Sequence, residues 1–164
     1  MGKPAMRRPP DAGFTYLALM MAVLVMGVAL ARLGEGWRAA GQREKEAQLL
    51  FVGQQMRSAL VQYYLHSPPG AVRHPASLEE LLEDRRVPGM RRYLRRIEVD
   101  PLTGTPEWGL VRDAQGRIYG VHSLSGAKPL KQANFRRADR NFAGAAKYSD
   151  WVFMFAPGQM AIAP

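Results

Sequence analysis

The sequence predicts an α+β protein in which a long N-terminal helix, membrane-spanning in its first half, packs on a small antiparallel β-sheet with a short second helix. Three observations predict this fold: an uncharged apolar run near the N-terminus, an apolar stripe with helical spacing after it, and two apolar runs around a glycine-closed turn. With 164 residues, the chain has room for one globular domain.

The apolar run from Phe14 to Ala31 has 18 residues and carries no charge. As a helix it would be roughly 27 Å long, close to the bilayer hydrocarbon thickness of about 30 Å. Residues 1–13 hold three bases and one acid, and short basic flanks tend to stay in the cytoplasm. The run therefore predicts a single-pass protein of the bacterial inner membrane whose C-terminal domain lies in the periplasm.

Three interpretations of this run stay open. A signal peptide cleaved after Ala31 would release an exported soluble domain, because Ala29-Leu30-Ala31 fits the small-x-small cleavage rule. An uncleaved signal anchor would need only the apolar run and its basic flank. The third interpretation depends on the junction Gly13-Phe14-Thr15, where a short basic leader ends in glycine and phenylalanine opens the apolar helix.

This junction resembles the leader of type IV prepilins, a family that includes the pseudopilins of type II secretion systems. The resemblance implies that a prepilin peptidase cuts after Gly13 and methylates Phe14. It also implies assembly with other pseudopilins on an inner-membrane platform into a filament, which is a role in protein transport. The residues of the assembly helix implied in this way are Phe14, Thr15, Tyr16, Leu17 and Ala18.

Ala18 departs from the family signature Gly-Phe-Thr-Leu-x-Glu, as does Tyr16. The family glutamate, which would stand at position 18, is thought to pair with the N-terminal amine of the neighbouring subunit. Because a buried unpaired charge is costly, a subunit of the filament body should need that glutamate. The resemblance therefore implies a minor or atypical pseudopilin, since the family precedent for a missing glutamate is a minor pseudopilin at the filament tip.

The long helix is predicted to continue beyond the apolar run, because no proline occurs until Pro68. The predicted domains are a basic leader 1–13, a transmembrane half-helix 14–31, a periplasmic half-helix 32–66 and a small α+β domain 67–164. One stripe of the half-helix recurs every three or four residues and should face a core. It consists of Leu49, Val52, Met56, Leu60 and Tyr64.

The remaining elements follow from caps and turns. Ser77 and Glu80 have capping-box spacing, which predicts a short second helix from Ser77 to about Arg86. Apolar runs at 108–111 and 118–121 flank a turn that closes with Gly116, which predicts a β-hairpin. Residues 123–147 read as a long polar loop, and Trp151 to Phe155 as a strand that closes the sheet.

Basic residues concentrate in two groups, in a chain whose net charge is +9. The first, a possible interaction patch, would stack at i,i+4 if residues 91–97 form a helical turn; it contains Arg91, Arg92, Arg95 and Arg96. The second contains Lys128, Lys131, Arg136, Arg137, Arg140 and Lys147. Such patches attract phosphate, so a DNA-binding minor pilin of an uptake machine is the alternative function, although a solvated face is the preferred interpretation and nucleic acid is an unlikely partner.

Catalytic and metal-binding functions find little support. The sequence has no cysteine and none of the usual nucleophile, zinc-protease or phosphate-loop motifs. Asp139 and Asp150 are the candidate calcium ligands, but the surrounding bases oppose a dication. We therefore expect a non-enzymatic protein with no cofactor and no metal site.

Overall fold

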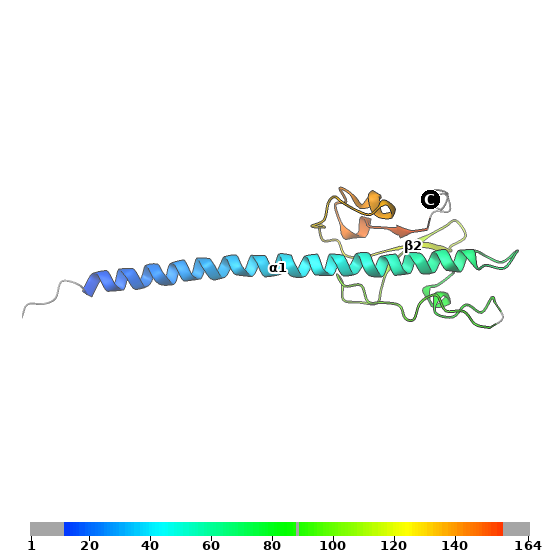
Figure 1. Ribbon diagram of the computed structural model, residues 1–164, viewed down its shortest axis with the longest axis horizontal. Coiled ribbons are helices and arrows are strands. Elements are labelled where there is room, and N and C mark those ends of the chain that lie inside the picture. Colours follow the sequence, from blue (N-terminus) through cyan, green and yellow to red (C-terminus); the bar gives the residue numbers. More distant parts are fainter. Residues whose placement is uncertain (1–11, 88, 156–164) are drawn as a thin grey trace, which may run out of the picture. The chain divides into compact units, whose positions relative to one another are not determined.

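The computed structural model describes residues 12–87 and 89–155, so most of the predicted leader lies outside the described residues (Figure 1). The chain divides into two compact units, residues 1–41 and 42–164. The helices are α1 (Ala12–Leu65) and three short 3₁₀ helices, η1 (Leu78–Leu81), η2 (Arg137–Phe142) and η3 (Tyr148–Asp150). The strands are β1 (Gly109–Arg112), β2 (Ile118–His122) and β3 (Phe153–Met154).

The prediction that the first half of α1 spans a membrane is wrong. Within 12–87 and 89–155, no helix offers a stretch that is at once long enough and apolar enough to cross a bilayer. The described apolar side chains run only from Phe14 to Leu30, about 26 Å of helix, and charge begins at Arg32. The fold is therefore α+β without the predicted transmembrane half, and the predicted inner-membrane localisation with a periplasmic domain is overturned with it.

In the second unit, α1 buries one face against the rest of the unit. Leu49 and Leu60 are fully buried, and Val52 and Met56 nearly so, which confirms most of the predicted stripe. The last position differs, because Tyr63 rather than Tyr64 is the buried tyrosine. The helix ends at Leu65, before the predicted stop at the two prolines.

The sheet has three antiparallel strands in the order β1-β2-β3. The predicted hairpin is confirmed, since Leu110 of β1 lies opposite Val121 of β2. In the turn between them, Gly116 has a φ of 75°. The predicted closing strand is shorter than its apolar run, since β3 contains only Phe153 and Met154, and beyond it the Phe155 amide still donates to the Tyr119 carbonyl at 2.9 Å. Phe153 packs so closely on α1 that a Cβ added at Gly53 would overlap its ring.

An aromatic cluster fills the core beside β3. The indole of Trp151 is fully buried and stacks on the ring of Phe142, with centroids 5.6 Å apart and planes 8° from parallel. Phe135 and Tyr148 meet the same indole edge-on, at 5.4 and 5.2 Å. The predicted polar loop 123–147 therefore contains a short helix, η2, and supplies core residues.

Two predicted helical segments are wrong in extent or type. The second helix is only the 3₁₀ turn η1, and the Ser77 side chain makes no cap hydrogen bond. Residues 91–97 do not form a helical turn, because their backbone bonds to residues 81–84 instead. The amide of Asp84 donates to the Arg91 carbonyl at 2.8 Å, and the amide of Leu94 donates to the Leu81 carbonyl at 3.0 Å.

Candidate functional site

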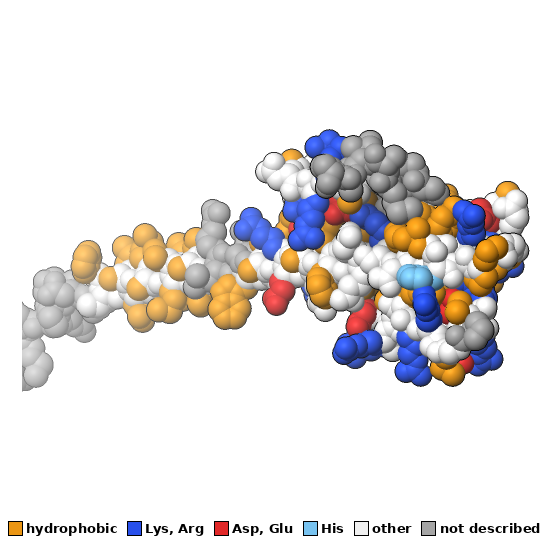
Figure 2. Space-filling view, turned by 45° about the vertical axis from the view of Figure 1, so that its right-hand side comes forward, with side chains coloured by type: hydrophobic (Ala, Val, Ile, Leu, Met, Phe, Trp, Pro, Cys, Tyr) orange, Lys and Arg blue, Asp and Glu red, His pale blue; other side chains and the backbone are white. Residues whose placement is uncertain are grey.

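The first candidate site is the surface of α1 from Phe14 to Leu30, called here the apolar segment. All its large apolar side chains are exposed, with exposed fractions from 46% at Met20 to 77% at Phe14. Consecutive residues of a helix lie about 100° apart, so these side chains cover every side of it. Apolar side chains cover the visible face of this part of α1 in Figure 2. Contiguous exposed apolar surface of this size marks an interaction site.

The predicted processing junction lies where α1 begins. The helix starts at Ala12, so the Gly13–Phe14 peptide bond falls in its first turn. The side chains of the predicted assembly residues, Phe14 to Ala18, are all exposed. The segment that follows the junction is therefore accessible to other proteins.

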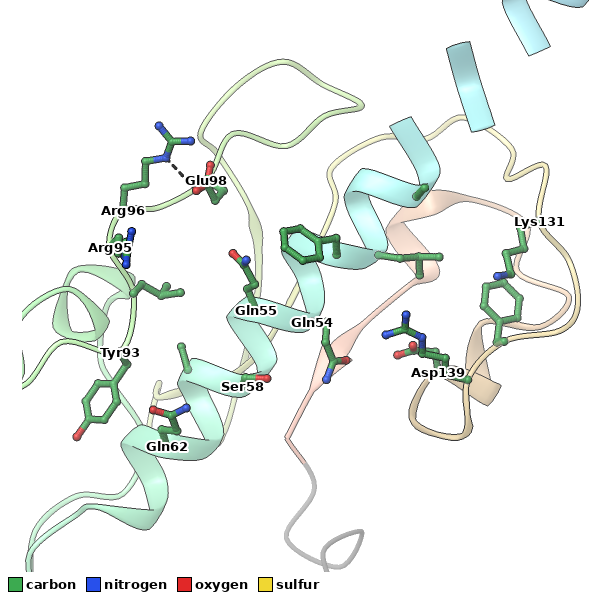
Figure 3. A pocket seen from close by; sticks show the side chains of 17 residues that line it. Gln54, Gln55, Ser58, Gln62, Tyr93, Arg95, Arg96, Glu98, Lys131 and Asp139 are labelled. Atoms are coloured by element: carbon green, nitrogen blue, oxygen red, sulfur yellow. Dashed lines mark hydrogen bonds and ion pairs between the residues drawn. The ribbon is translucent and has the colours of Figure 1, made fainter. Parts of the chain in front are cut away.

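The second candidate site is a groove in the second unit, with a volume of about 810 Å³, called here the groove (Figure 3). One face of α1 forms its floor, from which Gln54, Gln55, Ser58 and Gln62 extend between two loops. Residues 93–98 form one wall and residues 131–139 the other. The floor is the helix face opposite the predicted stripe, so the helical period places these glutamines outside the core.

The walls of the groove carry more positive than negative charge. Arg95 and Arg96 line one wall, and Lys131 and Arg136 line the other. The two carboxylates in the groove are already paired. Glu98 accepts from Arg96 Nε at 2.9 Å, and Asp139 accepts from Arg57 Nη2 at 2.7 Å.

The wall at 131–139 is fixed to α1 by two buried carboxylates. Glu46 is 4% exposed and accepts from the amides of Leu130 and Lys131, at 2.5 and 3.1 Å, and from the Tyr148 hydroxyl at 2.9 Å. Asp139 forms its ion pair with Arg57 where both side chains are about nine-tenths buried. Because buried charges need partners, these bonds hold the wall at one position on the helix.

The wall at 93–98 is fixed by a network around Asp84, which is 1% exposed. Its carboxylate accepts from Arg86 Nη2 at 2.8 Å and from the Tyr93 hydroxyl at 2.9 Å. The hydrogen bond from Arg86 is the main reason that the pKa of Asp84 falls to about 2. The Arg86 guanidinium also lies over the Tyr63 ring, 3.5 Å from its centroid, and so ties this loop to α1.

The predicted interaction patch coincides with the groove only in part. All four of its arginines are exposed, as expected for a solvated face. Arg95 and Arg96 line the groove, but Arg91 and Arg92 are not among its lining residues. The second basic group contributes Lys131 and Arg136 to the lining. Sequence reasoning missed the groove itself, although an exposed aromatic residue off the core stripe, Phe51, was a visible signal.

The candidate calcium ligands are engaged elsewhere. Asp139 pairs with Arg57, and Asp150 accepts from the Lys147 amide at 2.9 Å. Within 12–87 and 89–155, no three or more histidine, cysteine or acidic side chains are grouped so that they could hold a metal ion. Burial lowers the pKa of His74, which packs against the rings of Tyr64 and Phe155.

Comparison with known proteins gives no match: no protein-family model, no curated protein and no solved structure is similar to this chain. The resemblance of the leader therefore stays a prediction. The function has to be argued from the apolar segment and the groove.

Proposed function

We propose that this chain is a subunit of a type IV pilin-like filament of the pseudopilin class, in which the apolar segment packs against the same segment of neighbouring subunits. The observation that carries the proposal is the exposure of Phe14 to Leu30 on all sides of α1. Burying one large apolar side chain contributes about 1.5–3 kcal/mol, so the segment offers a strong driving force for association. A single partner would cover one face only, whereas several neighbouring helices would cover all faces.

The leader junction supports the same proposal. Gly13 and Phe14 match the residues at which a prepilin peptidase cuts and methylates, and the bond between them lies in the first turn of α1. Removal of residues 1–13 would take away three bases and one acid just before the apolar segment. The N-terminus of the helix would then be free to enter a bundle of neighbouring helices.

Ala18 supports a minor role at the filament tip. A charged N-terminal amine among apolar helices needs a partner, because an isolated buried charge is costly. Ala18 cannot provide the carboxylate for the amine of a neighbouring subunit. A subunit with no neighbour on one side has no such requirement. If the chain and its Ala18→Glu variant were both incorporated at high copy number, this tip assignment would be wrong.

The experiment that tests the proposal is mass and N-terminal analysis of the chain from cells with and without a prepilin peptidase. We expect an N-terminus at methylated Phe14 that depends on the peptidase. An N-terminus at Arg32 would instead identify an exported domain released by signal peptidase. An uncut chain in both hosts would also contradict the proposal.

A second measurement tests assembly directly. The mature chain should form sedimentable filaments, visible by electron microscopy, together with its sister subunits. Replacing the exposed Leu17 and Leu24 by glutamine should prevent their formation, because two polar side chains would enter the helix bundle. Arg43→Gln, an exposed polar change on the same helix, is the matched control.

A further inference from the structure

The packing of apolar segments leaves the groove of the second unit without a role. We propose that the groove binds an extended acidic segment of another protein, whose carboxylates point alternately to the two walls while its backbone bonds to the polar floor. This inference goes beyond the proposed function. It concerns the second unit alone and holds whether or not the chain forms a filament.

The floor of the groove is a row of polar side chains that the fold leaves unused. Gln55, Ser58 and Gln62 lie three or four residues apart on one face of α1, between the two walls (Figure 3). None of the three forms a side-chain hydrogen bond within the residues that the structure describes. A glutamine amide offers donors and an acceptor, as a peptide group does. The floor therefore suits a peptide backbone, whose own amide and carbonyl groups need partners.

The length of this row sets the length of the ligand. Phe51 extends the row by one turn, and from Phe51 to Gln62 the helix rises about 16 Å. An extended peptide advances about 3.3 Å per residue, so the row accommodates about five residues. Phe51 is 64% exposed and offers an apolar contact at one end.

The walls of the groove provide the charge complementarity. Successive side chains of an extended peptide point to opposite sides, at right angles to its backbone hydrogen-bonding groups. A backbone that bonds to the floor therefore directs its side chains alternately to the two walls. Arg95 lies on one wall and Arg136 on the other, and both are exposed and have no acidic partner among the described residues. Neighbouring acids of the peptide would each form a charge-assisted bond to one of these guanidinium groups.

The two carboxylates that line the groove already have partners inside the fold. Glu98 pairs with Arg96 at 2.9 Å, and Asp139 pairs with the buried Arg57 at 2.7 Å. The unpaired charges of the described lining are therefore positive. An acidic segment is attracted to both walls, whereas a basic segment is repelled by both.

The walls keep their spacing without a ligand. Buried bonds from Glu46 and Asp139 fix one wall to α1, and the hydrogen bonds of Asp84 fix the other. A site whose parts are already in place loses less conformational entropy on binding. A short peptide therefore suffices to occupy it.

Two other occupants fit the groove less well. A second copy of this chain would have to supply an extended acidic run, but its densest run of acids, residues 79–84, includes η1. Three of the four carboxylates in that run are also bonded within the chain. A nucleic acid binds best to an unbroken track of cations, whereas Glu98 interrupts one wall and Asp139 the other.

Fluorescence anisotropy with a synthetic peptide tests the inference on the whole chain in detergent. The probe is a leucine followed by four glutamates, with fluorescein at its N-terminus and an amide at its C-terminus. The control peptide has glutamine in place of each glutamate. We expect saturable binding of the probe that weakens with salt, and affinity for the control that is about tenfold lower or less.

Matched charge reversals test whether the peptide binds in the groove. Arg95→Glu with Arg136→Glu should lower the affinity for the probe about tenfold or more. Arg91→Glu with Arg92→Glu makes the same change in net charge at exposed arginines outside the lining. This second pair should lower the affinity less than about threefold, because only long-range attraction is lost. Thermal unfolding of each variant, followed by circular dichroism, separates loss of binding from loss of fold.

An N-methylated probe tests the role of the floor without any change to the protein. Methyl groups on alternate backbone amides keep the four charges and remove donors, so this probe should bind about fivefold more weakly. Gln55→Ala with Gln62→Ala should weaken binding of the plain probe by a similar factor. The same variant should also bind the two probes almost equally, because the bonds that distinguish them are gone.

Several outcomes would overturn the inference. Equal binding of the glutamine peptide, or equal losses from the two charge reversals, would show that the groove does not select an acidic segment. An oligonucleotide of equal charge that binds more tightly and is released by Arg95→Glu with Arg136→Glu would give the groove to nucleic acid. Self-association in detergent that the same reversal abolishes would give it to a second copy. None of these results bears on the apolar segment, so the proposed function stands or fails separately, by the N-terminal analysis.

Discussion

The two ends of α1 differ in whether their apolar side chains are buried or exposed. From Gln42 to Leu65 the helix keeps most of them on one stripe, which the second unit buries in its own core, and leaves Phe51 and Leu65 exposed. From Phe14 to Leu30 they occupy all sides and are all exposed. The spacing of the apolar residues, rather than their number, therefore decides whether the same chain can bury them or whether they stay exposed to other molecules.

The largest expected effect lies in the aromatic core. Trp151→Ala should lower the free energy of unfolding by about 4 kcal/mol, because the fully buried indole loses its contacts with Phe142 and Phe135 and leaves a cavity. Urea denaturation followed by near-ultraviolet circular dichroism measures it. The control is Trp37→Ala, whose side chain is 81% exposed and whose loss should change stability by less than about 0.5 kcal/mol. Equal effects at the two tryptophans would mean that Trp151 is not packed in the core of the second unit.

The second effect depends on pH. Asp84→Asn should cost about 3 kcal/mol at pH 7, because it leaves Arg86 with an uncompensated, partly buried charge. The folded pKa of about 2 lies below the ordinary value of 3.8, so the carboxylate stabilises the fold above pH 4. About 2 kcal/mol of that stabilisation is lost as the pH falls towards 2.

Urea midpoints of Asp84→Asn and the parent chain should therefore converge between pH 4 and pH 2. The exposed Glu107 provides the control, since Glu107→Gln should leave the midpoint almost unchanged at either pH. A gap between Asp84→Asn and the parent that stayed constant across this range would mean that the ion pair does not hold the loop.

A smaller effect concerns the contact between helix and sheet. Gly53→Ala should destabilise the chain by about 2 kcal/mol, because the new methyl group overlaps the Phe153 ring. Gly41→Ala, on the same helix with open space around it, should instead stabilise by up to about 1 kcal/mol. If the thermal unfolding midpoints of Gly53→Ala and Gly41→Ala moved in the same direction, the Phe153 ring would not pack against the helix at Gly53.

The smallest effect is expected in the apolar segment. Leu24→Ala should change the stability of the second unit by less than about 0.5 kcal/mol, because the side chain is 61% exposed. Leu60→Ala, the same change at a fully buried position, should cost about 3 kcal/mol. The prediction is checked in dissociating detergent, where no other subunit covers Leu24. A large loss at Leu24 there would mean that the segment is buried within its own chain.

Local patterns in the sequence predicted the elements whose bonds are local. The stripe from Leu49 to Leu60 and the hairpin around Gly116 follow from helical period and turn chemistry. The helical turn at 91–97 was wrong because the backbone at Leu94 bonds to Leu81, which no periodicity within the turn could indicate. The prediction that residues 14–31 span a membrane was wrong because it took an uncharged apolar run as sufficient evidence for a membrane-spanning helix.

The groove could be predicted only in part. Helical period placed Gln54, Gln55 and Gln62 away from the core. Arg95 and Arg96 are exposed as expected, but the helical turn from which this was expected does not form. The walls could not be predicted, because the acids that fix one of them bond across 82 to 102 residues. A buried glutamate such as Glu46 looks like any other helix surface residue until its distant partners are known.

The long sequence separation of the Glu46 bonds also sets an order of events during synthesis. Its partners at Leu130 and Lys131 are made roughly 100 residues after the apolar segment, a delay of about 5–20 s at usual translation rates. Until then the apolar segment can already meet other proteins, while one wall of the groove does not yet exist. A nascent chain would therefore expose its apolar segment first, and only a completed chain would carry the groove.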